Sequence, residues 1–201
     1  MRQLKSVCVF CGSRSGENPI YEEQTYALGK HLANNNITLV YGGGHLGLMG
    51  AVANGALDNK GKVTGIIPKF LYEISGIPEF SNKLDKLIIT EDMHERKMRM
   101  FENADAFIAL PGGIGTLEEL VEQLTWSQLG QHNKPILLAD FDNFWQPFLD
   151  LLKHMQDSSF TYNERDIKPL RAQSAEEIVP MLSHALQNQE PNEEDLISRL
   201  S

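Results

Sequence analysis

The segment AFIALPGGIGTLEEL, Ala106–Leu120, places a short apolar run, a glycine-rich loop and the start of a helical pattern in direct succession. An apolar run of this length, bounded by proline and glycine, is typical of a buried strand, and the residues after Thr116 follow a helical period. Strand, tight loop and helix in this order begin a βα unit. The segment therefore predicts a parallel sheet whose strands alternate with helices.

The same alternation continues along most of the chain. It predicts strands at 6–10, 37–41, 62–67, 86–90, 106–110 and 135–139, with helices near 19–34, 47–59, 92–103, 116–129, 144–156 and 174–187. Right-handed crossovers between them yield an α/β fold, a doubly wound parallel sheet with helices on both faces. We expect residues 1–188 to form a single domain and the polar, acidic tail 189–201 to fray.

Composition narrows the class of protein further. A chain of 201 residues, 41% of them hydrophobic, suits one globular domain that buries roughly 70% of its unfolded surface. We expect a cytoplasmic protein without membrane contact, because the first apolar run is shorter than the ~7–15 residues of a signal-peptide core and no window approaches a membrane span. A net charge of −9 disfavours nucleic acid as a partner.

Three glycine-rich loops follow three of the predicted strands, namely CGSRSG (11–16), YGGGHLGLMG (41–50) and PGGIGT (111–116). Because the carboxyl ends of parallel strands meet at one edge of a sheet, the three loops could share one ligand. The second loop lacks the G-x-G-x-x-G spacing of a dinucleotide fingerprint. A tight turn with glycines for helix packing, and direct ligand contact, explain it about equally well.

The third loop raises a conflict, because two glutamates follow a structure suited to phosphate. Its glycines let the backbone approach a ligand, and a helix opening at Thr116 would offer free N–H groups to an anion, which Glu118 and Glu119 should repel. One interpretation is a capping box, Thr116-x-x-Glu119, with the acids as helix starters. The other is that the glutamates face a different part of the same ligand. The glycine density favours the second, since a capping box needs no such glycines.

A short basic cluster, Arg96, Lys97 and Arg99, lies in DMHERKMRM (92–100), where Asp92 can cap a helix. The cluster could be a solvated helix face with charge pairs four residues apart. Alternatively, Arg96 and Lys97 begin a helix at the same sheet edge, where an arginine fork suits phosphate or ribose oxygens.

No metal or cofactor is expected. Cys8 and Cys11 form a C-x-x-C, but their odd spacing on a strand sends the two side chains to opposite faces, which favours buried residues without redox function. The six histidines show no zinc-site spacing. His94 alone falls near the candidate site, where a place on the helix surface is the better interpretation.

Six segments in order, VCVFCGSRSG, YGGGHLGLMG, GIIPKFL, DMHERK, LPGGIGTLEEL and TWSQLGQHNKP, resemble the Lonely Guy family of cytokinin riboside 5′-monophosphate phosphoribohydrolases. The resemblance runs from about residue 6 to about residue 157, and PGGxGTxxE with an upstream HERK is its most specific part. It implies a Rossmann-like, usually dimeric enzyme that hydrolyses the N-glycosidic bond of a nucleoside 5′-monophosphate, either AMP or an N6-modified AMP. The products are the free base and ribose 5-phosphate.

By this resemblance Arg96 and Glu119 match the catalytic arginine and glutamate of the family. The candidate substrate-binding residues are Gly12, Ser13, Gly43, Gly44, Lys97, Gly112, Gly113, Ile114, Gly115, Thr116 and Thr125. Two places depart from the family pattern: Arg14 stands where many members have a small residue, and residues 72–86 have no firm counterpart. The second departure leaves the residues that shape the base pocket undefined.

The family has also carried the label lysine decarboxylase. A pyridoxal phosphate enzyme needs a Schiff-base lysine and a partner for the pyridinium nitrogen, and the sequence offers no convincing arrangement of either, so Lys97 is better explained as an anion contact. A non-catalytic nucleotide sensor or cofactor carrier is the alternative function, because a fold alone does not decide activity. The joint presence of Arg96 and Glu119 favours the enzyme.

Overall fold

The computed structural model describes residues 3–74, 78–160 and 168–188, and within them seven parallel strands form one sheet in the order β4-β3-β2-β1-β5-β6-β7. The strands are β1 (Ser6–Phe10), β2 (Thr38–Tyr41), β3 (Val63–Pro68), β4 (Lys86–Thr90), β5 (Ala106–Ala109), β6 (Ile136–Ala139) and β7 (Leu170–Ala172). The strand order reverses between β1 and β5, which makes their carboxyl ends the topological switch point. The prediction of a doubly wound α/β fold is confirmed.

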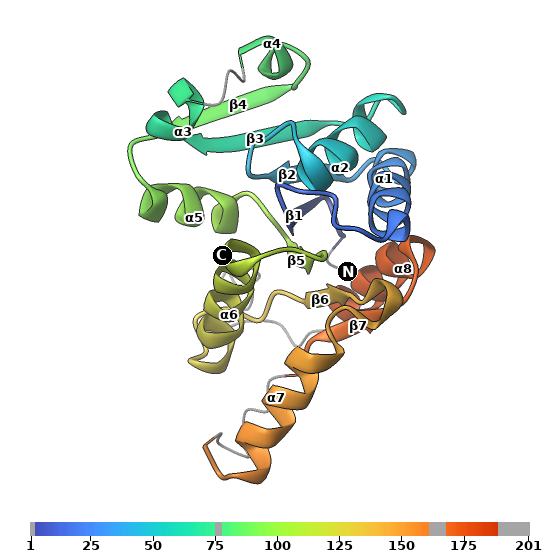
Figure 1. Cartoon of the computed structure of the whole chain (residues 1–201), viewed down its shortest axis with the longest axis vertical. Coiled ribbons are helices and arrows are strands. Elements are labelled where there is room, and N and C mark those ends of the chain that lie inside the picture. The colour runs from blue at the N-terminus through green and yellow to red at the C-terminus, as the bar shows by residue number, and fades with distance from the viewer. Residues whose placement is uncertain (1–2, 75–77, 161–167, 189–201) are drawn as a thin grey trace, which may run out of the picture.

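Helices cover both faces of the sheet (Figure 1). On one face, the buried residues of α1 (Pro19–Asn34), α2 (Gly47–Leu57) and α8 (Ala175–Gln187) join those of the strands in one apolar cluster. On the other, α5 (Met93–Glu102), α6 (Ile114–Gln128) and the start of α7 (Gln146–Asp157) share a second cluster with the strands. The short helices α3 (Lys69–Ile74) and α4 (Pro78–Ser81) follow β3, and a 3₁₀ turn, η1 (Phe141–Asn143), precedes α7.

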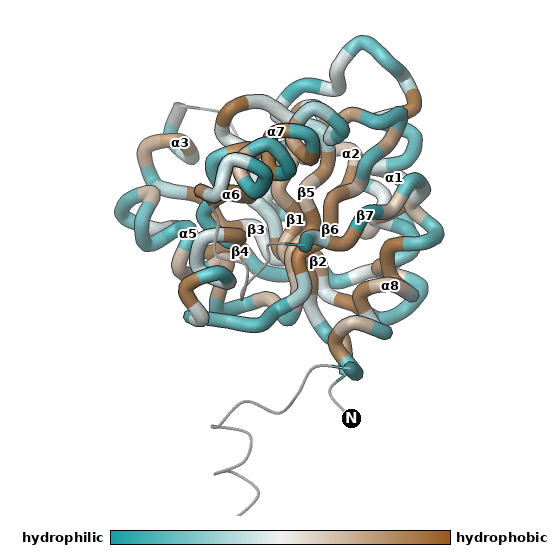
Figure 2. The backbone as a smooth tube through the Cα atoms, turned by 90° about the horizontal axis from the view of Figure 1, so that it is seen from below, coloured by the Kyte–Doolittle hydropathy of each residue, from teal (hydrophilic) through white to brown (hydrophobic). Residues whose placement is uncertain are grey.

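Strand β1 shows how the sequence divides its side chains between these two cores. Val7, Val9 and Cys11 lie in the cluster with α1, α2 and α8, whereas Cys8 and Phe10 lie in the cluster with α5 and α6. This alternation confirms that the two cysteines face opposite sides of the sheet. Both are free and buried, and burial raises the pKa of both thiols. Figure 2 shows the apolar strands enclosed between more polar helices.

The capping box at Thr116, the less favoured of the two interpretations of this segment, does not form. Helix α6 begins two residues earlier, at Ile114, with Gly113 as its N-cap and no side chain bonded to the cap position. Thr116 therefore stands inside the first turn and is buried, packed against Gly112, where an added Cβ would lie 2.7 Å from the Cβ of Thr116. The glycine loop can turn into a helix without a polar cap, since glycine tolerates the tight approach that this entry requires.

Other predicted boundaries move slightly, and the sequence pattern did not predict the short elements α3, α4, η1 and β7. Helix α2 ends at Leu57, and α7 begins at Gln146 because η1 occupies the residues before it. These four elements are three to six residues long, too short for a clear hydrophobic period. The predicted tail 189–201 lies outside the described residues. Within the described ranges, no helix combines the length and apolar character needed to cross a membrane.

Candidate active site

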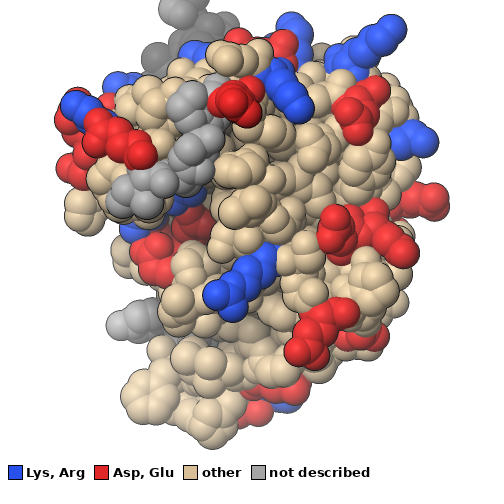
Figure 3. Space-filling view, turned by 45° about the horizontal axis from the view of Figure 1, so that its top comes forward, with Lys and Arg blue, Asp and Glu red and all other residues tan. Residues whose placement is uncertain are grey.

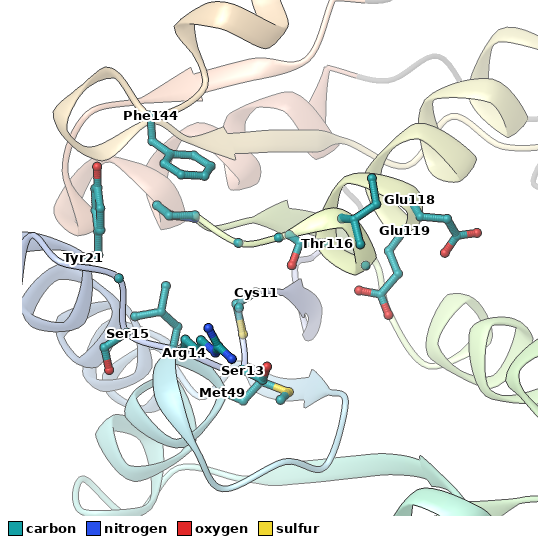
Figure 4. Close-up of a pocket in the computed structure, with 18 of the residues that line it drawn as sticks. Cys11, Ser13, Arg14, Ser15, Tyr21, Met49, Thr116, Glu118, Glu119 and Phe144 are labelled. Carbon is teal, nitrogen blue, oxygen red and sulfur yellow. The ribbon is translucent and has the colours of Figure 1, made fainter.

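A cavity of about 630 Å³ opens at the switch point, beyond the carboxyl ends of β1 and β5 (Figure 4). Its size falls within the ~300–1,000 Å³ that is usual for small-molecule sites. The loop after β1, the start of α2, the start of α5 and the loop before α6 all contribute to its wall. Nine of the candidate residues line it: Gly12, Ser13, Arg96, Gly112, Gly113, Ile114, Gly115, Thr116 and Glu119.

The two loops that follow β1 and β5 are packed backbone against backbone. The N–H of Gly12 donates to the carbonyl of Pro111 at 3.1 Å, and a Cβ on Gly112 would lie 2.9 Å from the nitrogen of Gly12. A side chain at Gly112 would therefore force the loops apart. By contrast, an added Cβ on Gly113 or Gly115 would meet nothing within 4 Å, so these two glycines leave open space in front of the helix.

The start of α6 is suited to an anion. No side chain caps it, so the N–H groups of its first turn have no side-chain acceptor at the cap position. These groups carry the positive end of the helix dipole, and anions bind at such positions. Because Gly113 and Gly115 add no bulk, a phosphate can approach this helix end closely.

Arg96 and Glu119 form an ion pair between α5 and α6. The Nη1 atom of Arg96 lies 2.9 Å from Oε1 of Glu119, and each side chain is only 11% exposed. Arg96 also donates from Nε to the carbonyl of Ile66 at the end of β3, at 3.2 Å. Burial raises the pKa of Glu119, although Arg96 acts in the opposite direction. The pair is thus a carboxylate held with little water around it and anchored by a fixed guanidinium.

Lys97 is not among the residues that line the cavity. Its Nζ lies 2.8 Å from Oε1 of Glu118 and 2.8 Å from Oε1 of Glu122, both on α6. The prediction that Lys97 contacts the ligand's anion stays untested, but the structure assigns this side chain two carboxylates. These ion pairs also explain how two glutamates can follow a loop suited to phosphate. Glu118 and Glu119 are each paired with a cation from α5, which reduces their repulsion of a phosphate.

The glycine loop after β2 is explained largely by packing around Arg96. A Cβ on Gly42 would lie 2.3 Å from Nη2 of Arg96, and one on Gly44 would lie 2.5 Å from the end of the Met49 side chain. Gly43 has a φ of +76° and approaches Ile67 of β3. Three consecutive glycines thus make room for the guanidinium, a backbone turn and Met49. Neither Gly43 nor Gly44 lines the cavity.

Thr125 also lies away from the cavity. It is exposed on α6, and its hydroxyl donates to the carbonyl of Val121 in the same helix at 2.8 Å. His94 is exposed on α5, as interpreted from the sequence.

Sequence reasoning missed the apolar part of the cavity wall. Tyr21 of α1 and Phe144 after η1 meet edge to face, with ring centroids 5.8 Å apart, and Leu71, Met49 and Met93 add apolar surface. These residues come from five separate segments, and of them Met49 alone belongs to a glycine motif. Leu71 alone lies beside the segment suspected of shaping the base pocket. Of that segment, 75–77 lie outside the described residues.

These features are typical of nucleotide-binding α/β proteins: a doubly wound sheet, a cavity at its switch point, an open helix N-terminus and a buried arginine–glutamate pair. Comparison with protein families narrows this class, because residues 49–182 match the family model described as "Possible lysine decarboxylase". A cytokinin riboside 5′-monophosphate phosphoribohydrolase of Rhodococcoides fascians is 45% identical over 157 residues, 78% of each chain. The enzyme LOG7 of Arabidopsis thaliana, with the same name, is 40% identical over 98% of this chain and 88% of its own. The chain belongs to the Lonely Guy family of phosphoribohydrolases.

Solved structures agree on the fold. The molybdenum cofactor binding protein of Rippkaea orientalis superposes with a TM-score of 0.67 at 23% identity, covering 92% of this chain and 98% of its own. The molybdenum cofactor carrier protein of Chlamydomonas reinhardtii gives 0.65 at 18% identity, covering 92% and 100%. At this identity the likeness concerns the fold alone.

The residues do not fit the pyridoxal phosphate that a lysine decarboxylase would use. No lysine is among the described residues that line the cavity, and Lys97 on α5 is held by two carboxylates. Without a lysine at the cavity, a Schiff base has no place to form. The same part of the chain contains no group of three or more histidine, cysteine, aspartate or glutamate side chains placed to hold a metal ion.

Proposed function

We propose that this protein hydrolyses the N-glycosidic bond of adenosine 5′-monophosphate or its N6-modified, cytokinin-type relatives, and releases the free base and ribose 5-phosphate. One observation carries the proposal: a single cavity joins an open helix N-terminus to a buried arginine–glutamate pair. The curated relatives are named for this activity on cytokinin riboside 5′-monophosphates. The protein is accordingly an enzyme of the N-glycosyl hydrolase type.

The phosphate belongs at the start of α6. Its N–H groups and the open space before Gly113 and Gly115 accept a dianion, with Ser13 and Thr116 on the cavity wall nearby. In a nucleoside monophosphate, the 5′-phosphate and the anomeric carbon lie at opposite ends of the ribose. Glu119 follows five residues after the start of the helix, so one loop and helix meet both ends of the sugar.

Glu119 serves the anomeric carbon. When the bond from C1′ to the base breaks, its electron pair leaves with the base nitrogen, and positive charge develops on the ribose as in glycoside hydrolysis. The oxygen of a water molecule then bonds to C1′, and the departing base gains a proton. The carboxylate of Glu119 stabilises the positive charge, positions the water or accepts its proton, three roles open to one group in this place.

Arg96 supports this chemistry without donating a proton, because a guanidinium stays charged at any working pH. Its ion pair favours the ionised form of Glu119 against the cost of burial. Arg96 lines the same cavity, and a guanidinium suits the oxygens of the phosphate or an acceptor on the base.

A nucleotide sensor or carrier is the less favoured function. The named carriers among the solved structures share the fold only. A carboxylate buried beside a phosphate site weakens the binding of an anion, and a carrier gains nothing from it. The ion pair of Arg96 and Glu119 is a feature that hydrolysis uses and simple binding does not.

Base release from adenosine 5′-monophosphate and N6-isopentenyladenosine 5′-monophosphate, followed by chromatography, tests the proposal. The unphosphorylated ribosides are the controls. Release from the monophosphates alone is expected, because the phosphate site contributes to binding. Absence of release, together with a higher melting temperature in the same nucleotides, would establish the sensor or carrier instead.

The enzyme functions as a homodimer in the cytoplasm. Three apolar residues are 42% to 64% exposed: Met98 on α5, Val121 on α6 and Leu129 at the end of α6. A second copy of the chain would bury them. Two free, buried cysteines suit a reducing compartment. Figure 3 shows acidic and basic side chains scattered over one face, without a continuous basic stripe.

A further inference from the structure

Arg14 is an exposed cation on the cavity wall, in the loop that follows β1. Figure 4 shows its guanidinium group turned into the cavity. Within the described ranges, it takes part in no hydrogen bond and no ion pair, whereas arginines elsewhere, such as Arg96 and Arg99, are paired with glutamates. A free guanidinium at a ligand cavity has its full set of donors available.

The backbone that carries Arg14 is held firmly. Gly47, with a φ of +57°, lies so close that an added Cβ would stand 2.4 Å from the nitrogen of Arg14. Gly12, two residues before Arg14, accepts a hydrogen bond from the N–H of Met49 at 3.3 Å and donates one to Pro111 at 3.1 Å. The loop is therefore clamped between the start of α2 and the loop before α6, so Arg14 extends from a fixed point opposite the phosphate position.

The charges around the site explain why a further cation matters. Apart from Arg14, two cations, Arg96 and Lys97, are matched against three carboxylates, Glu118, Glu119 and Glu122. This group carries a net negative charge, which opposes an incoming phosphate dianion. The open end of α6 and Arg14 act in the opposite direction and favour the anion.

We propose that Arg14 binds the 5′-phosphate and that it sets the preference of this enzyme for the phosphorylated substrate over the free riboside. The inference rests on the proposed function, and it names the residue of the same site that recognises the dianion. An arginine fork can donate two parallel hydrogen bonds to a phosphate, from the side opposite the N–H groups of α6. It also binds ribose 5-phosphate, since the product keeps the same phosphate.

The kinetic consequence follows from what the phosphate does during the reaction. Its charge and position change little between the bound substrate and the transition state, so Arg14 contributes equally to both. Removal of Arg14 should therefore raise KM and leave kcat nearly unchanged. For a charge-assisted hydrogen bond in a site open to solvent, we expect a KM about tenfold higher.

The experiment compares Arg14→Gln and Arg14→Lys with a matched control, Lys30→Gln. Lys30 is an exposed cation in the second half of α1, whereas Tyr21, which lines the cavity, lies in the first turn of that helix. Base release from adenosine 5′-monophosphate gives KM and kcat. Inhibition by inorganic phosphate, and the rise in melting temperature in ribose 5-phosphate, report on the phosphate site without turnover. We expect Arg14→Gln to raise KM and the inhibition constant of phosphate about tenfold and to reduce the rise in melting temperature. Arg14→Lys should change these quantities less, and Lys30→Gln should leave them unchanged.

Unchanged KM and unchanged phosphate inhibition in Arg14→Gln would overturn the inference. An equal loss of affinity for the unphosphorylated riboside would overturn it too, because Arg14 would then contact the base or the sugar. If Arg14→Gln folds poorly, Arg14→Lys serves in its place, because lysine keeps the aliphatic stem of the side chain. The same measurements of phosphate inhibition and melting temperature then test the inference. If the parent protein releases no base, the melting shifts in phosphate and ribose 5-phosphate still test Arg14, so the two proposals fail separately.

Discussion

At the scale of single residues, the most informative side chain is Glu119. It is 11% exposed and lies at the cavity of a protein that must attract an anion. Burial of a carboxylate is unfavourable unless it is paired, and Arg96 supplies the partner at 2.9 Å. A carboxylate at a cavity whose unfavourable burial is offset by an ion pair indicates a functional role more strongly than a structural one.

The substitution Glu119→Gln should keep the fold and nucleotide binding but lose most turnover, by about 10²–10⁴-fold in kcat, because an amide neither carries the negative charge nor accepts a proton. The kinetics of base release measure the loss, and differential scanning calorimetry checks the fold. Glu118→Gln is the matched control, since its carboxylate is 54% exposed and bonds Lys97. Full activity in Glu119→Gln would exclude a catalytic role.

The raised pKa of Glu119 predicts a dependence on pH. If the carboxylate is the active form, kcat/KM should fall on the acid side at a pH above the ordinary glutamate pKa of 4.5. The raised pKa also affects stability, because the native state holds this proton more tightly than the unfolded state. The contribution of Glu119 is therefore fully present below its unfolded pKa and is lost as pH rises through the folded pKa.

Profiles of kcat/KM against pH, and of melting temperature against pH for the parent and Glu119→Gln, measure these two effects. The difference in melting temperature between the two proteins should shift in favour of the glutamine variant as pH rises. A constant difference over the whole range would show that Glu119 titrates alike in both states.

At the scale of elements, helices α5 and α6 and the loop after β2 jointly fix the reactive pair. Arg96 comes from the first turn of α5 and is anchored to the end of β3, while Glu119 comes from the second turn of α6. Asp92 caps α5 by accepting from the N–H of Glu95 at 2.8 Å, as the sequence indicated. The ion pair therefore depends on how two helices and one glycine loop are packed.

Gly42→Ala tests this dependence. The new methyl group would fall 2.3 Å from Nη2 of Arg96, the end of a flexible side chain, so the arginine should move and the fold should survive. We expect a loss of about tenfold or more in kcat/KM, since small displacements at a reacting centre are costly, and little change in melting temperature. Gly44→Ala is the control, because its methyl group meets Met49 instead. Equal activity in the two variants would contradict the role given to Gly42.

At the scale of the whole molecule, the switch point of the sheet decides where the site lies. Segments from residues 11 to 16, 111 to 119 and 144 reach one cavity only because β1 and β5 are neighbours at the centre of the sheet. The charged and apolar walls of the cavity therefore come from distant parts of the chain. The exposed apolar residues Met98, Val121 and Leu129 lie on the outer helices α5 and α6 and at the end of α6, where a second copy of the chain could cover them.

Leu129→Glu tests the proposed homodimer. A charge in the centre of an apolar interface should dissociate it, because the carboxylate would lose its water without a partner. Light scattering after size-exclusion chromatography measures the mass, with Leu46→Glu as the control, since Leu46 is 60% exposed and lies beside α2 on the other face of the sheet. A parent protein that runs at its monomer mass of 22.6 kDa would contradict the proposal.

The sequence by itself determined the alternation of strands and helices, because hydrophobic period and glycine loops are local properties of the chain. Six of the strands lie where the pattern predicts them, whereas β7 was missed, since three residues with an arginine in the middle carry no such period. The family motifs also singled out Arg96 and Glu119, which the structure brings together.

Only the tertiary structure decided how the charges are paired. Arg96 and Glu119 are 23 residues apart, Lys97 and Glu122 are 25 apart, and Gly42 makes room for Arg96 from another loop. No local pattern encodes such contacts, because they depend on which strands are neighbours and how the helices pack on them. For the same reason, the sequence could mark Arg14 as unusual, but only the folded chain turns it into the cavity, where it has no hydrogen-bond or ion-pair partner among the described residues.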